Sequence, residues 1–257
     1  MPLLGLSLAL LIGLSLGLLG GGGSILTVPV FVYVLRYGVK PAVAMSLAVV
    51  GTTSLVGAAG HWRRGNVNLR AALTFAPVAM LGTFAGARLA RQVSETAQLT
   101  LFATLMLAAA GVMARGAPRA EAPGADRSGG SAPATGLGSQ LLVGALGGAV
   151  GVLTGLAGIG GGFLIVPALT LLARLPMKQA IGTSLVVIAL NAAAGFAGYL
   201  GRVELDWAVV AGFTSVAILG VGLGTRLAHH VPPLALRRGF AAFLAVTAGW
   251  ILVGGGR

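Results

Sequence analysis

The sequence contains no cysteine, and charged residues are scarce in it. Only 9% of its 257 residues are Asp, Glu, Lys or Arg, whereas an average soluble domain has about a quarter. The absence of cysteine excludes disulfides, thiolate nucleophiles and cysteine-ligated metals. Because there are also only three histidines, we expect no metal site and no cofactor.

Apolar residues fill most of the remaining sequence. They make up 56% of the chain, and the mean hydropathy is +0.96. A membrane-spanning helix needs about 20 mainly apolar residues, and the strands of a membrane barrel would alternate apolar and polar residues, which this sequence does not do. We therefore predict an all-α, multi-pass integral membrane protein, and we interpret the first twenty residues, which lack a basic start, as retained membrane segment. The predicted hydrophobic segments are 41–60, 71–87, 96–114, 139–157, 179–201, 207–225 and 239–256.

Acidic residues are absent from the middle of these segments. All five lie in loops or at segment ends, and an enzyme would need convergent carboxylates, histidines or a nucleophile that are missing here. A proton-coupled carrier ordinarily has an intramembrane carboxylate, so coupling here would have to use the substrate's own protonation, a histidine, or Glu204 or Asp206. We interpret His61, beside Trp62, as an interfacial residue, and His229 and His230 as loop residues.

The 17 basic residues stand singly or in pairs between hydrophobic segments. Such positions suit orientation signals and contacts with lipid headgroups. We therefore expect membrane lipids and a small anion as partners, and no nucleic acid. A homodimer remains open.

The sequence is internally duplicated. A shift of 138 positions superposes Gly13 on Gly151, Pro29 on Pro167 and Arg88 on Arg226, together with further glycines, basic residues and the Ser46 and Ser184 pair. Chance similarity between apolar helices would not preserve loops and glycines together. We predict a first membrane repeat at 1–114 and a second at 138–257, joined by a flexible linker at 115–137 that is rich in Pro, Gly and Ser.

Each repeat opens with an apolar segment, a glycine run and a second, short apolar segment. One helix over residues 3–35 would be about 50 Å long, against a hydrocarbon thickness of about 30 Å. We therefore expect the chain to turn back at the glycines. Three further spans then follow in each repeat, and this odd number predicts inverted repeats. With inverted repeats the basic residues divide 11 to 6 between the two faces, whereas parallel repeats divide them 9 to 8, so the inverted arrangement with a cytoplasmic linker is favoured.

The glycine runs are the predicted binding site. A helix that begins inside the membrane leaves its first N–H groups without partners and carries a partial positive charge at that end. Two such starts facing each other would bind an anion without a buried Arg or Lys. The candidate residues are Gly21, Gly22, Gly23 and Ser24 in the first repeat, and Gly160, Gly161 and Gly162 in the second.

The next segment of each repeat adds neutral polar side chains. Their hydroxyl and amide donors suit an oxyanion without burying a charge. These candidates are Ser46 and Thr53 in the first repeat, and Thr183, Ser184 and Asn191 in the second.

Both repeats thus carry a glycine-rich run followed by Leu-x-Val-Pro, a basic loop and a Ser-Leu or Gly-Thr-Ser-Leu segment. In this combination the chain resembles the TauE/SafE-type sulfite exporters from about Gly13 to Trp250. The resemblance implies a transporter of the bacterial inner membrane for sulfite, sulfonates or other small sulfur-containing or organic anions. A secondary carrier is our main hypothesis, a passive anion channel of the same architecture is the alternative, and an enzyme or assembly scaffold is disfavoured.

Overall fold

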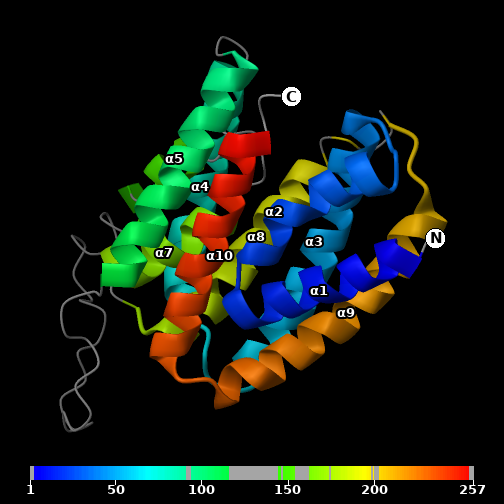
Figure 1. Ribbon diagram of the computed structural model, residues 1–257. Helices are drawn as coiled ribbons and strands as arrows, with labels where there is room; N and C mark the ends of the chain where they lie inside the picture. Colours follow the sequence, from blue (N-terminus) through cyan, green and yellow to red (C-terminus); the bar gives the residue numbers. More distant parts are fainter. Residues whose placement is uncertain are drawn as a thin grey trace, which may run out of the picture.

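The chain folds into a bundle of helices. The computed structural model describes residues 3–90, 94–115, 144–145, 147–153, 162–173, 175–197, 199 and 203–254. All regular secondary structure in these residues is helical (Figure 1), which confirms the all-α prediction.

The two halves of the chain show the same order of elements. The first contains α1 (Leu3–Leu19), α2 (Gly22–Pro29), a π-helix η1 (Val30–Val34), α3 (Val39–Trp62), α4 (Leu69–Ala90) and α5 (Glu95–Arg115). In the second, residues 147–153 are helical in the place of α1. They are followed by α7 (Gly162–Pro167), a π-helix η2 (Ala168–Leu172), α8 (Met177–Ala197), α9 (Trp207–His230) and α10 (Pro233–Gly254).

Membrane-spanning character is confirmed for several of the predicted segments. Among the described residues, four helical stretches have the length and apolar composition needed to cross a bilayer: Lys40–Trp62, Leu69–Gly86, Met177–Ala197 and Trp207–His230. The predicted segment at 139–157 lies largely outside the described residues. The chain is thus a helical membrane protein.

The first glycine run breaks the chain as predicted. Gly20 ends α1 with φ +80°, a left-handed conformation that glycine adopts without steric cost. Gly23 then lies against the carbonyl oxygen of Ile12, where a Cβ would come within 2.3 Å of it. Because such contact brings α2 back along α1, the break forms a hairpin. Its second arm, Gly22–Val34, is apolar but short, about 20 Å at 1.5 Å per residue.

The packing between the halves is reciprocal. Gly13 of α1 lies against Ala217 of α9, and Gly151 lies in the same way against Ala79 of α4. Both contacts are related by the 138-residue shift, so each half packs its first helix on the fourth helix of the other. Figure 1 shows α1 and α9 side by side.

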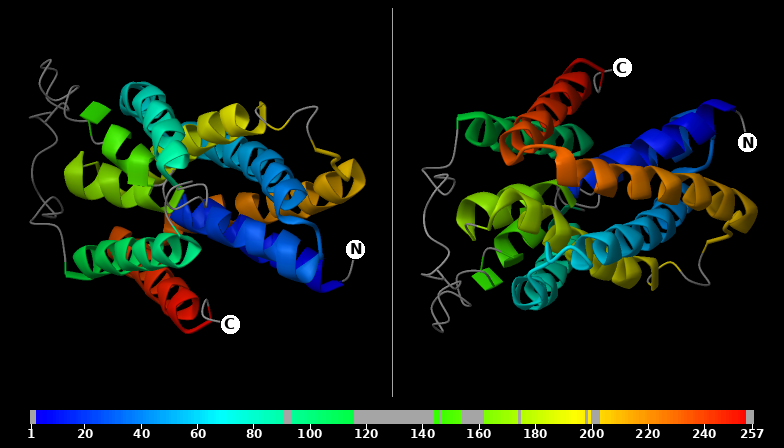
Figure 2. Two further views of the ribbon diagram at one scale, coloured as in Figure 1. Left: turned by 90° about the horizontal axis from the view of Figure 1, so that it is seen from above. Right: turned by 90° about the horizontal axis from the view of Figure 1, so that it is seen from below.

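The relation between α3 and α8 bears on the orientation of the halves. Gly57 of α3 packs on Leu185 of α8, and Gly195 of α8 packs on Leu47 of α3. The two equivalent helices are therefore antiparallel. A two-fold axis that relates two antiparallel helices is perpendicular to them. For helices that cross a bilayer such an axis lies in the membrane plane, and this agrees with inverted repeats. Figure 2 shows α3 and α8 crossing at the centre of the bundle.

One end of the bundle collects basic residues. Arg64, just after α3, donates a hydrogen bond to the carbonyl oxygen of Thr225 in α9. Lys178, at the start of α8, donates to the carbonyl oxygen of His229 across 2.9 Å. The ends of α3 and α9 and the start of α8 are thus neighbours. His229 and His230 belong to the last turn of α9, which corrects their interpretation as loop residues.

Candidate functional site

The buried start of α2 forms the centre of the candidate site. Gly21 caps this helix without any side-chain hydrogen bond, so no side chain among the described residues satisfies the first N–H groups of α2. Ser24 is 8% exposed and its hydroxyl donates to the carbonyl oxygen of Gly21 across 2.8 Å. The donors and the positive end of the helix dipole are therefore inside the protein.

The second half of the chain supplies a polar side chain to this break. Ser184 of α8 is fully buried, and its hydroxyl lies 3.3 Å from the carbonyl oxygen of Gly20 and 2.8 Å from that of Ile181. A Cβ at Gly20 would lie 2.8 Å from the Ser184 oxygen. The structure thus brings together Ser184 and the first glycine run, which are far apart in the sequence.

Apolar elements enclose the same region. α2 contacts α7 and α10, and a Cβ at Gly22 would lie 2.9 Å from the Phe243 ring of α10. Leu19 and Ile25 share one core cluster with Leu164 and Ile165 of α7. Low-dielectric walls of this kind strengthen the interaction between an anion and helix N–H groups.

The other polar candidates have different surroundings. The hydroxyl of Thr53 bonds back to the carbonyl oxygen of Val49 in its own helix at 2.6 Å. Thr183 accepts a hydrogen bond of 2.9 Å from the backbone N–H of Asn68, which ties the α3–α4 loop to α8. The Oδ1 atom of Asn191 is buried and has no hydrogen-bond partner among the described residues. Ser46 is 3% exposed on α3.

The second glycine run lies mostly outside the described residues. Gly160 and Gly161 fall in the undescribed range 154–161, while Gly162 is the first residue of α7. The expectation that two helix starts face each other therefore stays a prediction.

Sequence reasoning missed His61. Its position at the end of α3 suggests an interfacial residue, yet its side chain is only 2% exposed. Its Nε2 atom lies 3.2 Å from the carbonyl oxygen of Gly17, and its Nδ1 atom has no hydrogen-bond partner among the described residues. The position beside Trp62 at a helix end gave no sign of burial, because part of the covering structure comes from α8 of the other half.

Tyr37 and Asp206 form a polar pair outside the membrane-spanning segments. The Tyr37 hydroxyl donates to Asp206 Oδ2 across 2.7 Å. The pKa of Asp206 is lowered, first by the backbone N–H of Val209 and then by Tyr37. The pKa of Tyr37 is raised, first by desolvation and then by Asp206. The pair connects the η1–α3 loop to the start of α9 and is separate from the break.

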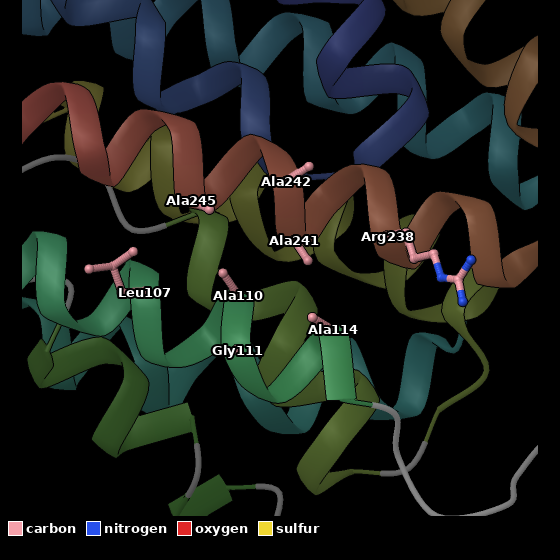
Figure 3. Close-up of a pocket in the computed structure, with 8 residues that line it drawn as sticks. All are labelled: Leu107, Ala110, Gly111, Ala114, Arg238, Ala241, Ala242 and Ala245. Carbon is pink, nitrogen blue, oxygen red and sulfur yellow. The ribbon is translucent and has the colours of Figure 1, made fainter.

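A surface groove of about 470 Å³ lies between α5 and α10 (Figure 3). Small apolar residues and Arg238 line it, and none of the predicted site residues does. The groove is therefore not the candidate site.

Comparison with known proteins gives a consistent result. Residues 5–251 match the family model described as "Sulfite exporter TauE/SafE". A "Probable membrane transporter protein" of Xylella fastidiosa (strain 9a5c) is 37% identical over 220 residues, which cover 85% of this chain and 81% of that protein. One of Haemophilus influenzae is 30% identical over 96% of each chain, and MJ0441 of Methanocaldococcus jannaschii, with the same printed description, is 28% identical over 98% of this chain and 97% of its own. No solved structure matches the chain significantly.

Proposed function

This chain belongs to the TauE/SafE sulfite exporter family of membrane transporters, and we propose that it is a secondary transporter that moves a small anion across the bacterial inner membrane. Sulfite is the foremost candidate, followed by sulfonates and other small organic anions. The protein acts by binding and conformational change and performs no chemical step on its substrate.

The observation that carries this proposal is the buried, side-chain-free start of α2 with Ser184 beside it. N–H groups at a helix start and the dipole attract an anion. No Asp or Glu is present in α1, α2, α3 or α8 to repel it. A site made of backbone N–H groups and hydroxyls contains no charged side chain, so no unpaired charge stays buried in the membrane when the anion leaves.

The packing of the halves suggests how the site is opened to each side in turn. Repeat transporters alternate by rocking one rigid unit against another. α1 with α9, and α4 with 147–153, are held by backbone contacts at glycine, so each pair would move as a unit. The break would then be exposed alternately on the two sides of the α3–α8 crossing.

The experiment is thermal unfolding of the detergent-purified protein with sulfite, sulfate, thiosulfate, taurine, sulfoacetate, lactate or chloride. A ligand that binds the folded state raises its apparent stability by mass action. We expect one sulfur oxyanion or sulfonate to give a concentration-dependent shift, and the Gly22→Leu variant to lose it, because the new side chain pushes Phe243 and occupies the helix start. Gly22 is suitable because its nearest neighbour is a side chain, whereas at Gly23 a Cβ meets backbone.

The matched control is Gly222→Leu, since nothing lies within 4 Å of a Cβ at Gly222. It should retain the full shift. Equal shifts in both variants would rule out the break as the site, and no shift with any anion would contradict a small-anion carrier. Counterflow in proteoliposomes then separates a carrier, which exchanges labelled for unlabelled anion, from a channel, which does not.

A further inference from the structure

His61 caps the C-terminal end of α1, directly before the glycine break. The carbonyl oxygen of Gly17 is among the last four of α1, which have no partner within a regular helix. His61 Nε2 lies 3.2 Å from it. Because a carbonyl can only accept a hydrogen bond, Nε2 must carry the hydrogen. In the neutral ring, Nδ1 is then a bare acceptor.

That second nitrogen lies in a buried environment without a partner. His61 is 2% exposed, and Nδ1 has no hydrogen-bond partner among the described residues. Thr225, 4% exposed, packs on neighbouring Gly60, and its hydroxyl oxygen likewise has no hydrogen-bond partner in the described part of the chain. Two buried polar atoms are thus unsatisfied where α1, α3 and α9 meet, although such groups are usually paired.

The repeats differ at this position. The 138-residue shift places Tyr199 where the first half has His61. Neutral histidine can take up a proton near neutral pH, and neutral tyrosine cannot. Any proton site built this way therefore exists once in the protein, at the first break.

The charged groups on the elements around His61 are all basic or are histidines. α3 contributes Lys40, the residues after it contribute Arg63 and Arg64, and α1 contributes no titratable side chain. The others are Arg70 and Arg88 on α4, Lys178 on α8, and Arg226, His229 and His230 on α9. None of these helices carries Asp or Glu. An imidazolium at His61 has no fixed counter-charge and needs an anion nearby.

We propose that His61 binds the proton that travels with the anion, so that the protein is a proton-coupled anion carrier. The proton enters at Nδ1, while Nε2–H stays on the Gly17 carbonyl oxygen. Its release restores the neutral ring. The negative end of the α1 dipole stabilises the imidazolium, and the positive end of α2, across the break, holds the anion.

This proposal rests on the proposed transport function and makes the two ligands interdependent. Gly17 is three residues from Gly20, about one helical turn of roughly 5 Å. An anion at the break favours the imidazolium, and by reciprocity the proton raises the affinity for the anion. The carrier that holds both the proton and the anion is then favoured over the carrier that holds only one of them.

The test measures the affinity of the purified full chain for sulfite and for isethionate between pH 6 and pH 8. Isethionate is included because its sulfonate does not titrate in this range, so any pH dependence belongs to the protein. One linked proton raises the affinity on acidification by at most about tenfold per pH unit. We expect this slope in the wild-type protein and a flat profile in His61→Gln, whose amide N–H can still donate to Gly17.

Two controls keep the result interpretable if His61→Gln fails to fold. His230→Gln changes an exposed histidine whose Nδ1 bonds to the Arg226 carbonyl oxygen, and it should keep the slope. The double variant His229→Gln/His230→Gln leaves His61 as the sole histidine, and it should keep the slope too. Loss of the slope in the double variant would overturn the proposal.

Flux measurements complete the test. In proteoliposomes containing a pH-sensitive dye, wild-type protein should acidify the lumen during isethionate entry and accumulate isethionate under an inward proton gradient, whereas His61→Gln should do neither. Anion binding by the wild-type protein with a flat pH profile overturns this proposal alone. Wild-type protein that neither binds nor moves any of these anions overturns the proposed function and this proposal together.

Discussion

Gly13 of α1 lies against the backbone of Ala217 in α9, so closely that a Cβ at Gly13 would come within 2.0 Å of the Ala217 carbonyl oxygen. The equivalent pair in the other half, Gly151 and Ala79, has a corresponding distance of 2.2 Å. Within a bilayer, where apolar burial does not drive helices together, such close backbone approach is a main source of association. The first helix of each half is thereby attached to the opposite half.

Gly13→Ala should therefore destabilise the fold. The added methyl group meets backbone, which cannot move aside as a side chain can, so α1 and α9 must separate. We expect a loss of about 1–3 kcal/mol in the free energy of unfolding, measured by denaturation in detergent. Gly222→Ala on α9 has open space around it and should be neutral. Equal stability of the two variants would contradict the packing described.

Asp206 predicts an acid-sensitive contribution to stability. Its pKa is lowered in the folded protein below the ordinary 3.8. A carboxyl with a depressed folded-state pKa stabilises the fold above its unfolded pKa, and this contribution is lost as the pH falls from about 4 through the lowered value. Asp206→Asn should show weaker acid dependence of the unfolding temperature over this range, because asparagine caps the helix without titrating. An unchanged acid dependence in the variant would show that Asp206 has no part in it.

Thr183→Val should loosen the α3–α4 loop. The substitution removes the hydroxyl that accepts the Asn68 N–H and leaves this donor unsatisfied, at a cost of about 1–3 kcal/mol. Hydrogen exchange should speed up at Asn68 in Thr183→Val and stay slow in Thr183→Ser, which keeps an acceptor. Equally slow exchange in both variants would mean that the hydrogen bond does not hold the loop.

Cysteine labelling tests the orientation, since the chain has no cysteine of its own. Ser94→Cys, after the far end of α4, and Ser128→Cys, in the predicted linker, place single thiols on opposite predicted faces. An impermeant maleimide applied to intact cells should label Cys at position 94 only. Labelling of position 128 alone would reverse the predicted topology, and labelling of both would contradict a cytoplasmic linker.

Much of the fold was readable in the sequence. Apolar runs predict helices wherever the bilayer offers no other partner for backbone groups, and the described part of the chain contains helices at the predicted places. The glycine run at 20–23 predicted the break, because a single helix over residues 3–35 would be longer than the bilayer is thick. The family resemblance is confirmed by the match over residues 5–251.

The correspondence between the loops of the two repeats was harder to predict from the sequence. In the sequence, Gly65-Asn66-Val67 aligns best with Gly201-Arg202-Val203, which differs by two residues from the 138-residue shift. The structure shows that the unmodified 138-residue shift relates the caps of the helices that follow. Asn68 Oδ1 accepts from Ala71 N–H at the start of α4, and Asp206 Oδ1 accepts from Val209 N–H at the start of α9. Both are N-caps at equivalent positions, but Asn and Asp alone do not reveal that equivalence.

The sequence by itself determined that this protein is helical, duplicated and embedded in a membrane, because these properties follow from composition and from local patterns. Only the tertiary structure decided that Ser184 reaches the glycine break of the other half, that Thr183 binds a loop, and that His61 is buried on the end of α1. Those relations join residues more than forty positions apart. They arise from the reciprocal packing of the two halves, which no local pattern encodes.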